Sequence, residues 1–172
     1  MKSIIVAVDE EYGIGKEGKL PWHYSEDMKF FSRTTKNSQC IMGRKTYEEI
    51  FEIMKLKNVE SLLPNRTCYV VSSDPDFQAK KAATCRSFEQ AWFMTTYRTE
   101  IVDRDVFVIG GSSMYELALP QIDTAFITFV PGTHDCDTFF TGMDYIKEQF
   151  YLESEEVSKE SNLKFTKYRR KQ

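Results

Sequence analysis

Asp27 is an acidic residue that stands among large apolar side chains. Trp22 precedes it, Met28 follows it directly, and Phe31 lies four residues later, one turn away in a helix. A carboxylate in apolar surroundings is costly to bury unless it is paired or used in chemistry. Burial also raises the pKa of a carboxyl group, which suits it to supplying or relaying a proton. We therefore take Asp27 as the candidate catalytic acid.

A turn that begins at Gly43 has the features of an anion site. Arg44, Lys45 and Thr46 follow this glycine at the start of a predicted helix. The first N–H groups of a helix lack intrahelical partners and attract anions, and two cations strengthen that attraction. An acid beside a phosphate-binding turn predicts redox chemistry on a heteroaromatic substrate with a phosphorylated cofactor.

A second glycine turn, Gly110-Gly111-Ser112-Ser113, follows the apolar run that ends at Ile109. The glycines permit close approach of the backbone, and the serines offer hydroxyls and amides at the start of the next predicted helix. This turn is a candidate pyrophosphate site. The alternative is a tight turn that binds no ligand.

Three further polar side chains stand at the ends of other predicted elements. Ser72 and Ser73 end a strand, and Arg86 precedes a helix. We expect them to gather with Arg44 and Lys45 around one phosphate at the ends of neighbouring strands. Taken singly, each of these charges is more typical of a solvated surface.

Residues 13–18 read Gly-Ile-Gly-Lys-Glu-Gly and match the spacing of the dinucleotide fingerprint. That fingerprint needs its first glycine at the end of a strand and a helix after its last. Here residues 9–12 intervene and Lys19-Leu20-Pro21 follows, so we reject the Rossmann interpretation. We predict a loop whose glycines let it close over a site, with an inert surface loop as the alternative.

The composition excludes several classes of protein. With 172 residues, 41% hydrophobic and 28% charged, the chain is expected to form one globular domain over residues 1–172. No apolar stretch is long enough to span a bilayer, and the apolar start meets acidic residues too soon for a signal peptide. A net charge of −3 argues against nonspecific nucleic-acid binding. The scattered Cys40, Cys68, Cys85 and Cys136 are expected to be reduced thiols of a cytoplasmic protein, and no metal site is expected.

Alternating strand and helix patterns predict an α/β fold. Strands are expected at 2–8, 39–42, 67–71, 105–109 and 123–130, helices at 25–35, 46–57, 87–97 and 112–119, and a closing antiparallel hairpin at 149–157 and 162–170. We expect Ser25 to cap the first helix and residues 9–24 to form a long loop. The alternation indicates a mostly parallel sheet with helices on both faces.

The chain resembles the dihydrofolate reductase family over nearly its whole length. The motifs that carry the resemblance are Gly15, Leu20-Pro21-Trp22, Asp27 with Phe31, Ile41-Met42-Gly43-Arg44-Lys45-Thr46, Leu63-Pro64-Asn65-Arg66, Val70-Val71-Ser72-Ser73, Val108-Ile109-Gly110-Gly111 with Tyr115, Thr128, and Asp137-Thr138-Phe139-Phe140. The resemblance implies a three-layer α/β/α fold with a mixed, mostly parallel, eight-stranded sheet and an antiparallel carboxy-terminal strand. It also implies NADPH-dependent reduction of dihydrofolate to tetrahydrofolate for one-carbon metabolism and thymidylate synthesis.

The resemblance further implies a role for individual residues. Asp27 would hold the pterin and promote its protonation, Thr128 would bond that carboxylate, and Trp22 would order a water. Arg66 would grip the carboxylate of the glutamate tail in a bidentate pair. The folate pocket would be walled by Ile5, Val6, Met28, Phe31 and Ile50. The residues expected to bind NADPH are Ala7, Ile14, Gly43, Arg44, Lys45, Thr46, Ser72, Ser73, Arg86, Ile109, Gly110, Gly111, Ser112, Ser113 and Tyr115.

Two details of the cofactor site also follow from the resemblance. Arg44, Ser72 and Arg86 would bind the 2′-phosphate, and Gly110 and Gly111 would be joined by a cis peptide bond. We further expect a monomer that binds antifolate inhibitors and has no nucleic-acid or membrane partner.

Departures from the family pattern are few. Residues 51–62 form a longer segment than in compact bacterial relatives, either a neutral insertion or a change to the folate cleft. Asn65 replaces a glycine that is common before the arginine and is able to adopt the same left-handed turn. Lys45 stands where some relatives carry histidine.

Two other functions remain open. A pyrimidine reductase of riboflavin synthesis has a related fold and uses NADPH, but Asp27 near Phe31, together with Arg66, argues against it. A binding module without activity is the second alternative, and the intact Asp27, Trp22 and glycine pair argue against that. Turnover of dihydrofolate discriminates between all three.

Overall fold

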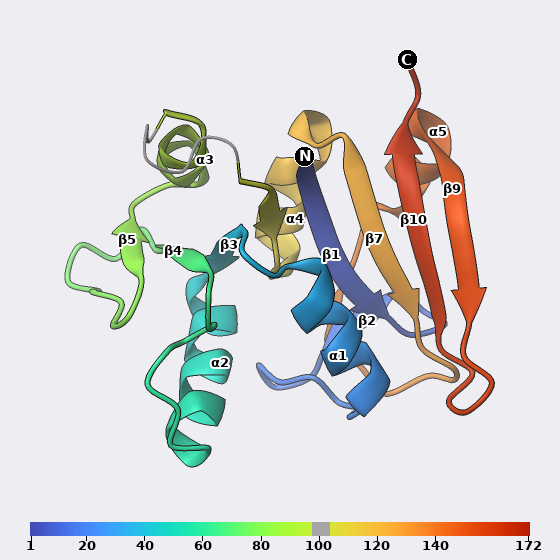
Figure 1. The fold of residues 1–172 in the computed structure, drawn as a ribbon, viewed down its shortest axis with the longest axis horizontal. Coiled ribbons are helices and arrows are strands. Elements are labelled where there is room, and N and C mark those ends of the chain that lie inside the picture. The colour runs from blue at the N-terminus through green and yellow to red at the C-terminus, as the bar shows by residue number, and fades with distance from the viewer. Residues whose placement is uncertain (98–103) are drawn as a thin grey trace.

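The computed structural model describes residues 1–97 and 104–172 (Figure 1). Its helices are α1 (Ser25–Thr34), α2 (Arg44–Leu56), α3 (Phe88–Tyr97), α4 (Ser112–Ala118) and α5 (Met143–Gln149), with a 3-10 turn η1 (Leu119–Gln121). Its strands are β1 (Lys2–Val8), β2 (Gly13–Gly15), β3 (Gln39–Gly43), β4 (Thr67–Val71), β5 (Ala83–Cys85), β6 (Val106–Val108), β7 (Thr124–Phe129), β8 (Thr138–Phe139), β9 (Phe150–Val157) and β10 (Lys164–Arg170). Among these helices, none is both long and apolar enough to cross a membrane.

Within the described ranges, eight strands form one sheet in the order β5-β4-β3-β6-β1-β7-β10-β9. Neighbours from β5 to β7 pair in parallel, and β10 pairs antiparallel with both β7 and β9. The predicted mixed, mostly parallel sheet with antiparallel carboxy-terminal strands is therefore confirmed. A separate two-stranded sheet joins β2 to β8.

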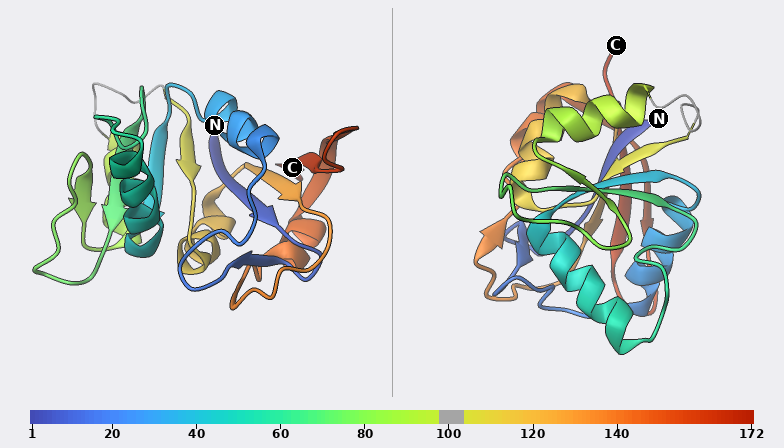
Figure 2. Two further views of the ribbon diagram at one scale, coloured as in Figure 1. Left: turned by 90° about the horizontal axis from the view of Figure 1, so that it is seen from below. Right: turned by 90° about the vertical axis from the view of Figure 1, so that its left-hand side faces the viewer.

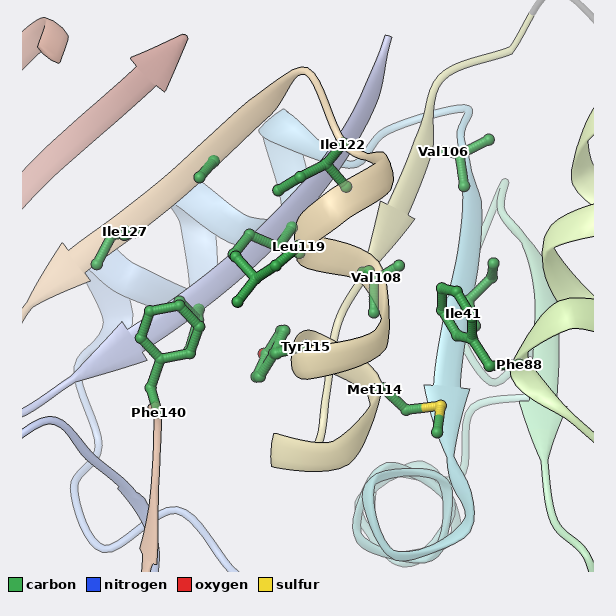
Figure 3. Close-up of a cluster of buried hydrophobic side chains, with 14 of the residues drawn as sticks. Ile41, Phe88, Val106, Val108, Met114, Tyr115, Leu119, Ile122, Ile127 and Phe140 are labelled. Atoms are coloured by element: carbon green, nitrogen blue, oxygen red, sulfur yellow. The ribbon is translucent and has the colours of Figure 1, made fainter. Parts of the chain in front are cut away.

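Helices cover both faces of the sheet (Figure 2). Because side chains alternate along a strand, each central strand contributes to two cores. One core joins Ile5, Met42 and Phe107 to the apolar sides of α1 and α2. The other lies under α3, α4 and α5, and Figure 3 shows Tyr115 of α4 within it. The three-layer arrangement follows from this alternation.

The sheet opens between its two central strands. Parallel pairing of β1 with β6 stops at Ile4 and Val108, whereas β1 stays paired with β7 as far as Val8. Beyond these residues, the carboxyl ends of β1 and β6 are no longer paired with each other. Crevices of this kind, outside the carboxyl ends of parallel strands, are where open α/β sheets bind ligands.

Several predicted boundaries need correction. Ser25 is the first residue of α1 rather than its cap, since the cap position is Tyr24 and no side chain bonds there. The expected loop at 9–24 contains β2, and α2 begins at Arg44, two residues earlier than predicted. The strand β5, the strand β8 and the helix α5 were not predicted. These elements span three, two and seven residues, too short for a clear periodic pattern.

Candidate active site

Asp27 lies in the first turn of α1, on the side that faces the sheet. Burial raises the pKa of its carboxyl group above the ordinary value, and a hydrogen bond from Thr128 partly offsets this. Thr128 is buried on β7, between Ala7 of β1 and Phe165 of β10 in the strand register. The predicted bond between Thr128 and Asp27 is therefore present.

Helix α1 places apolar side chains beside this acid. Phe31 and Ile50 pack in the core cluster that contains Ile5, so three of the five predicted wall residues come together. Met28 is 45% exposed and lies at the surface of the same helix. Val6 packs in the opposite cluster, with Tyr115 and Phe140, because neighbouring residues of a strand face opposite sides of the sheet.

Trp22 packs between the segment after β7 and the hairpin β9–β10. It is 9% exposed and lies in one cluster with Ala7 and Phe165, the two residues that flank Thr128. Its ring contacts His134 edge-on, with centroids 5.0 Å apart. The indole Nε1 is buried and has no hydrogen-bond partner within residues 1–97 and 104–172, so it is a free donor near the acid.

Tyr115 lies between the glycine pair and strand β1. Its hydroxyl donates to the carbonyl of Ile5 over 2.8 Å, just beyond the point where β1 leaves β6. Burial raises the pKa of Tyr115, and the charge of Asp27 raises it further. A Cβ on Gly110 would meet Thr46 Oγ1 at 3.1 Å and the Tyr115 hydroxyl at 3.3 Å. Gly110 and Gly111 are joined by a cis peptide bond, as the family pattern predicted.

A cavity of about 720 Å³ extends from this glycine pair along the start of α2. Eight of the predicted cofactor residues line it: Ile14, Gly43, Arg44, Lys45, Thr46, Gly111, Ser112 and Ser113. The first turn of α2 carries two cations and no acidic residue. Because the amino end of a helix is itself positive, this arrangement favours a bound anion. The other seven lie outside the lining: Ala7, Ser72, Ser73, Arg86, Ile109, Gly110 and Tyr115.

The predicted 2′-phosphate residues also come together, around Asp74, which was not predicted. Asp74 Oδ2 lies 2.9 Å from Arg44 Nη1, and the Asp74 carbonyl accepts from Arg86 Nη1 over 2.6 Å. The N–H of Asp74 donates to Ser72 Oγ over 3.3 Å. Ser73 is exposed on the same turn. Arg44 and Arg86 are therefore held by the turn after β4.

Arg66 lies away from the cofactor cavity. Its guanidinium is 5.9 Å above the ring of Phe31 and donates to Thr35 Oγ1 over 3.0 Å, at the far end of α1 from the acid. Asn65 has φ 61 and so adopts the predicted left-handed turn. Arg66 lines a separate cavity of about 520 Å³. Part of the longer 51–62 segment borders this cavity too, and Leu62 anchors that segment in the core under α2.

The loop that was predicted to close over a site is tied to the segment around β8. Strand β2 pairs with β8, and the N–H of Asp137 donates to the Gly15 carbonyl over 3.0 Å. The Glu17 N–H donates to Asp137 Oδ2 over 2.9 Å, and Lys16 Nζ lies 2.6 Å from Asp135 Oδ2. Residues of this loop line one side of the cavity, so the loop forms part of the wall of the predicted cofactor site, and its closure stays a prediction.

Asp9 holds the same loop from inside and was not predicted. This carboxylate is 1% exposed and accepts the N–H groups of Glu11, Gly13 and His134 at 2.8–3.0 Å. Burial pushes the pKa of Asp9 up, but these donors and the Cys136 thiol outweigh it and leave the pKa below the ordinary value. The sequence signal that could have identified Asp9 is an acidic residue directly after a buried strand and before a loop rich in glycine.

Comparison with known proteins gives one family. The family described as "Dihydrofolate reductase" matches residues 1–170. A dihydrofolate reductase of Drosophila melanogaster is 35% identical over 80% of this chain and 78% of its own length, and one of Enterococcus faecium is 30% identical over 91% and 87%. The solved structure of dihydrofolate reductase from Enterococcus faecalis, complexed with NADP(H) and RAB-propyl, superposes with a TM-score of 0.81. It has 31% identity and covers 100% of this chain and 97% of that one.

Proposed function

Because the chain belongs to the dihydrofolate reductase family, we propose that it reduces dihydrofolate to tetrahydrofolate with NADPH. The observation that carries the proposal is the position of Asp27. It is a half-buried acid with a raised pKa and a bond from Thr128, and its charge acts on the buried Tyr115, whose hydroxyl lies beside Gly110. The product would serve one-carbon metabolism and thymidylate synthesis.

The residues around the cavity fit a phosphorylated dinucleotide. Gly43 and Gly111 present bare backbone, and the nearest atoms to a Cβ on Gly111 lie at 3.8 Å, so space remains for a ligand. The start of α2 supplies free N–H groups with Arg44 and Lys45, and Thr46, Ser112 and Ser113 supply hydroxyls. These residues would hold NADPH, which supplies the hydride when bound. Ala7, Ile14 and Tyr115 would border the nicotinamide.

Asp27 would act on the substrate from the opposite side of the crevice. Its carboxylate would accept hydrogen bonds from the amino group and the adjacent ring nitrogen of the pterin, which would fix the ring. It would also promote protonation of the imine nitrogen. A raised pKa brings the acid closer to the pH at which it exchanges protons readily. Thr128 holds the carboxylate in place, and the free Trp22 Nε1 donor would order the water that delivers the proton.

Ile5, Phe31 and Ile50 would line the apolar part of the folate site, and Arg66 would bind the carboxylate of the glutamate tail. Support for the tail position comes from the contact of Arg66 with Phe31 of α1 and with Thr35, directly after that helix. A guanidinium offers two parallel donors to a carboxylate, whereas an ammonium offers a single charged centre.

Replacing Arg66 by lysine is expected to raise the Michaelis constant for dihydrofolate roughly tenfold, through loss of the bidentate pair. NADPH affinity should stay the same, since the cavities lined by Arg66 and by the cofactor residues share no residue. Steady-state kinetics with dihydrofolate and with a pterin that lacks the glutamate measure the effect. Equal impairment with both substrates would show that Arg66 has only a structural role.

The test of the proposed function is an assay of NADPH oxidation that depends on dihydrofolate. Turnover with dihydrofolate supports the proposal. Tight NADPH binding without turnover would favour a binding module, and turnover of a pyrimidine substrate instead would favour the riboflavin-pathway alternative.

We also propose a cytoplasmic monomer that functions as one domain over residues 1–172 and binds antifolate inhibitors at the folate site. The cytoplasmic location is supported by the four cysteines, all of them free thiols. Gel filtration tests the monomer, and displacement of dihydrofolate by a diaminopyrimidine tests the inhibitor site.

A further inference from the structure

The turn after β4 places a carboxylate inside the group of residues proposed to bind the 2′-phosphate. This turn is Asp74-Pro75-Asp76, and it follows the carboxyl end of β4 on the segment that leads to β5 (Figure 1). Asp74 Oδ2 is 2.9 Å from Arg44 Nη1, and Asp74 Oδ1 accepts the Asp76 N–H over 2.9 Å. The carboxylate is therefore fixed by the turn on one side and by Arg44 on the other.

Arg44 is held in this position by three contacts. Its Nε lies 2.9 Å from Glu48 Oε1, its Nη1 bonds Asp74, and its guanidinium lies 4.5 Å above the ring of Phe77. Arg44 also lines the large cavity. A phosphate that reaches this guanidinium must share it with Asp74, or displace the carboxylate.

Arg86 bonds the backbone of the turn and not the Asp74 carboxylate, so it does not remove the competition between that carboxylate and a phosphate for Arg44. Its Nη1 donates to the carbonyl of Asp74 over 2.6 Å, and its Nη2 donates to that of Pro75 over 3.2 Å. These bonds orient the turn and leave the Asp74 carboxylate facing Arg44. Hydrogen bonding by Asp76 and the charge of Arg44 hold the pKa of Asp74 below its ordinary value, so it is an anion at neutral pH.

An acid and an arginine favour different cofactors in dinucleotide sites. A carboxylate accepts a hydrogen bond from the free ribose hydroxyl of NADH, whereas an arginine accommodates the phosphate of NADPH. In this chain, the Asp74 carboxylate and the Arg44 guanidinium are in direct contact at the proposed 2′-phosphate site. On the basis of the proposed function, we propose that Asp74 is a specificity-determining residue that lowers the preference of this chain for NADPH over NADH.

The experiment compares the dissociation constants of NADPH and NADH for the wild-type chain and for Asp74→Asn. Asparagine keeps the shape and the acceptor for the Asp76 N–H but removes the charge. We expect the preference for NADPH to rise roughly fivefold, mostly through tighter NADPH binding, because a like charge is removed and Arg44 is released. Quenching of tryptophan fluorescence or calorimetry gives both constants.

Asp76→Asn is the matched control. It removes the same charge two residues away, and in the described structure its carboxylate forms no ion pair. It should change the preference less than twofold. In an Arg44→Gln background, Asp74→Asn should also lose most of its effect, since Arg44 is the group that it releases.

Three results would overturn the inference: an unchanged preference, equal weakening of both cofactors, or a selective loss of NADPH affinity. Equal weakening would make Asp74 a turn residue, and selective loss would make it a support for Arg44. Because the binding measurements need no folate, they report on Asp74 even if the wild-type chain fails to reduce dihydrofolate. That failure would contradict the proposed function alone.

Discussion

The Asp27→Asn variant is expected to lose dihydrofolate turnover at neutral pH by roughly a hundredfold or more, the usual contribution of a positioned acid. The amide fills the same space and keeps a partner for Thr128, so the fold and NADPH binding should be retained. The loss should shrink in acid, where solvent protonates the substrate directly. Stopped-flow measurement of the hydride-transfer rate between acidic and neutral pH measures both effects.

Glu26→Gln is the matched control, since Glu26 precedes Asp27 in the same turn and accepts a partly buried hydrogen bond from Ser158, which glutamine can also accept. It should keep wild-type turnover. Near wild-type turnover of Asp27→Asn at neutral pH would remove Asp27 from the catalytic role.

The same substitution is expected to stabilise the folded chain at neutral pH. Burial raises the folded-state pKa of Asp27 above its ordinary value of 3.8, so the folded state binds this proton more tightly than the unfolded state does. The wild-type chain therefore loses stability as the pH rises from about the ordinary value through the folded-state pKa. The asparagine amide does not titrate, so the melting temperature of the variant should exceed that of wild type increasingly as pH rises through this window.

The Gly110→Ala variant is expected to lose about 2 to 4 kcal/mol of unfolding free energy. Gly110 has φ +128, a conformation that a residue with a Cβ rarely adopts, and that Cβ would press on Thr46 Oγ1 at 3.1 Å and on the Tyr115 hydroxyl at 3.3 Å. Tyr115 is buried and held by its bond to the Ile5 carbonyl. Urea unfolding followed by circular dichroism measures the loss.

Gly111→Ala provides the comparison within the same pair. Gly111 has φ −90, and its Cβ would meet only Thr46 Oγ1, at 3.8 Å. The fold should change by less than about 1 kcal/mol, but the new methyl group enters the cavity and should weaken NADPH binding. Equal unfolding midpoints for Gly110→Ala and wild type would contradict the steric argument.

Much of this fold was predictable because its central strands and longer helices have clear periods. Buried parallel strands read as continuous apolar runs, and β1, β4 and β7 were placed within one residue. The short α5 and β8 were missed because seven and two residues are too few for a clear periodic pattern. At the site, the sequence predicted Asp27 and its partner Thr128, since the family motif names both.

Other parts of the site depend on geometry that a motif does not carry. Val6 was expected beside Ile5 in the folate pocket, yet adjacent strand residues face opposite sides, and Val6 packs under α4. Asp74 was missed because an Asp-Pro turn is typical of an ordinary surface connection. Only the structure shows its carboxylate against Arg44.

The four cysteines allow structural changes of the chain to be followed by thiol labelling. Cys40, Cys68 and Cys85 are at most 5% exposed, and burial raises the pKa of Cys40 to about 11 and that of Cys68 to about 12. Burial and the charge of Asp9 raise the pKa of Cys136 to about 11. Thiolates, which react with alkylating reagents, are therefore scarce in the native state. Alkylation of Cys40, Cys68 and Cys85 is therefore expected to report unfolding of the sheet, and alkylation of the partly buried Cys136 is expected to report release of its contact with Asp9.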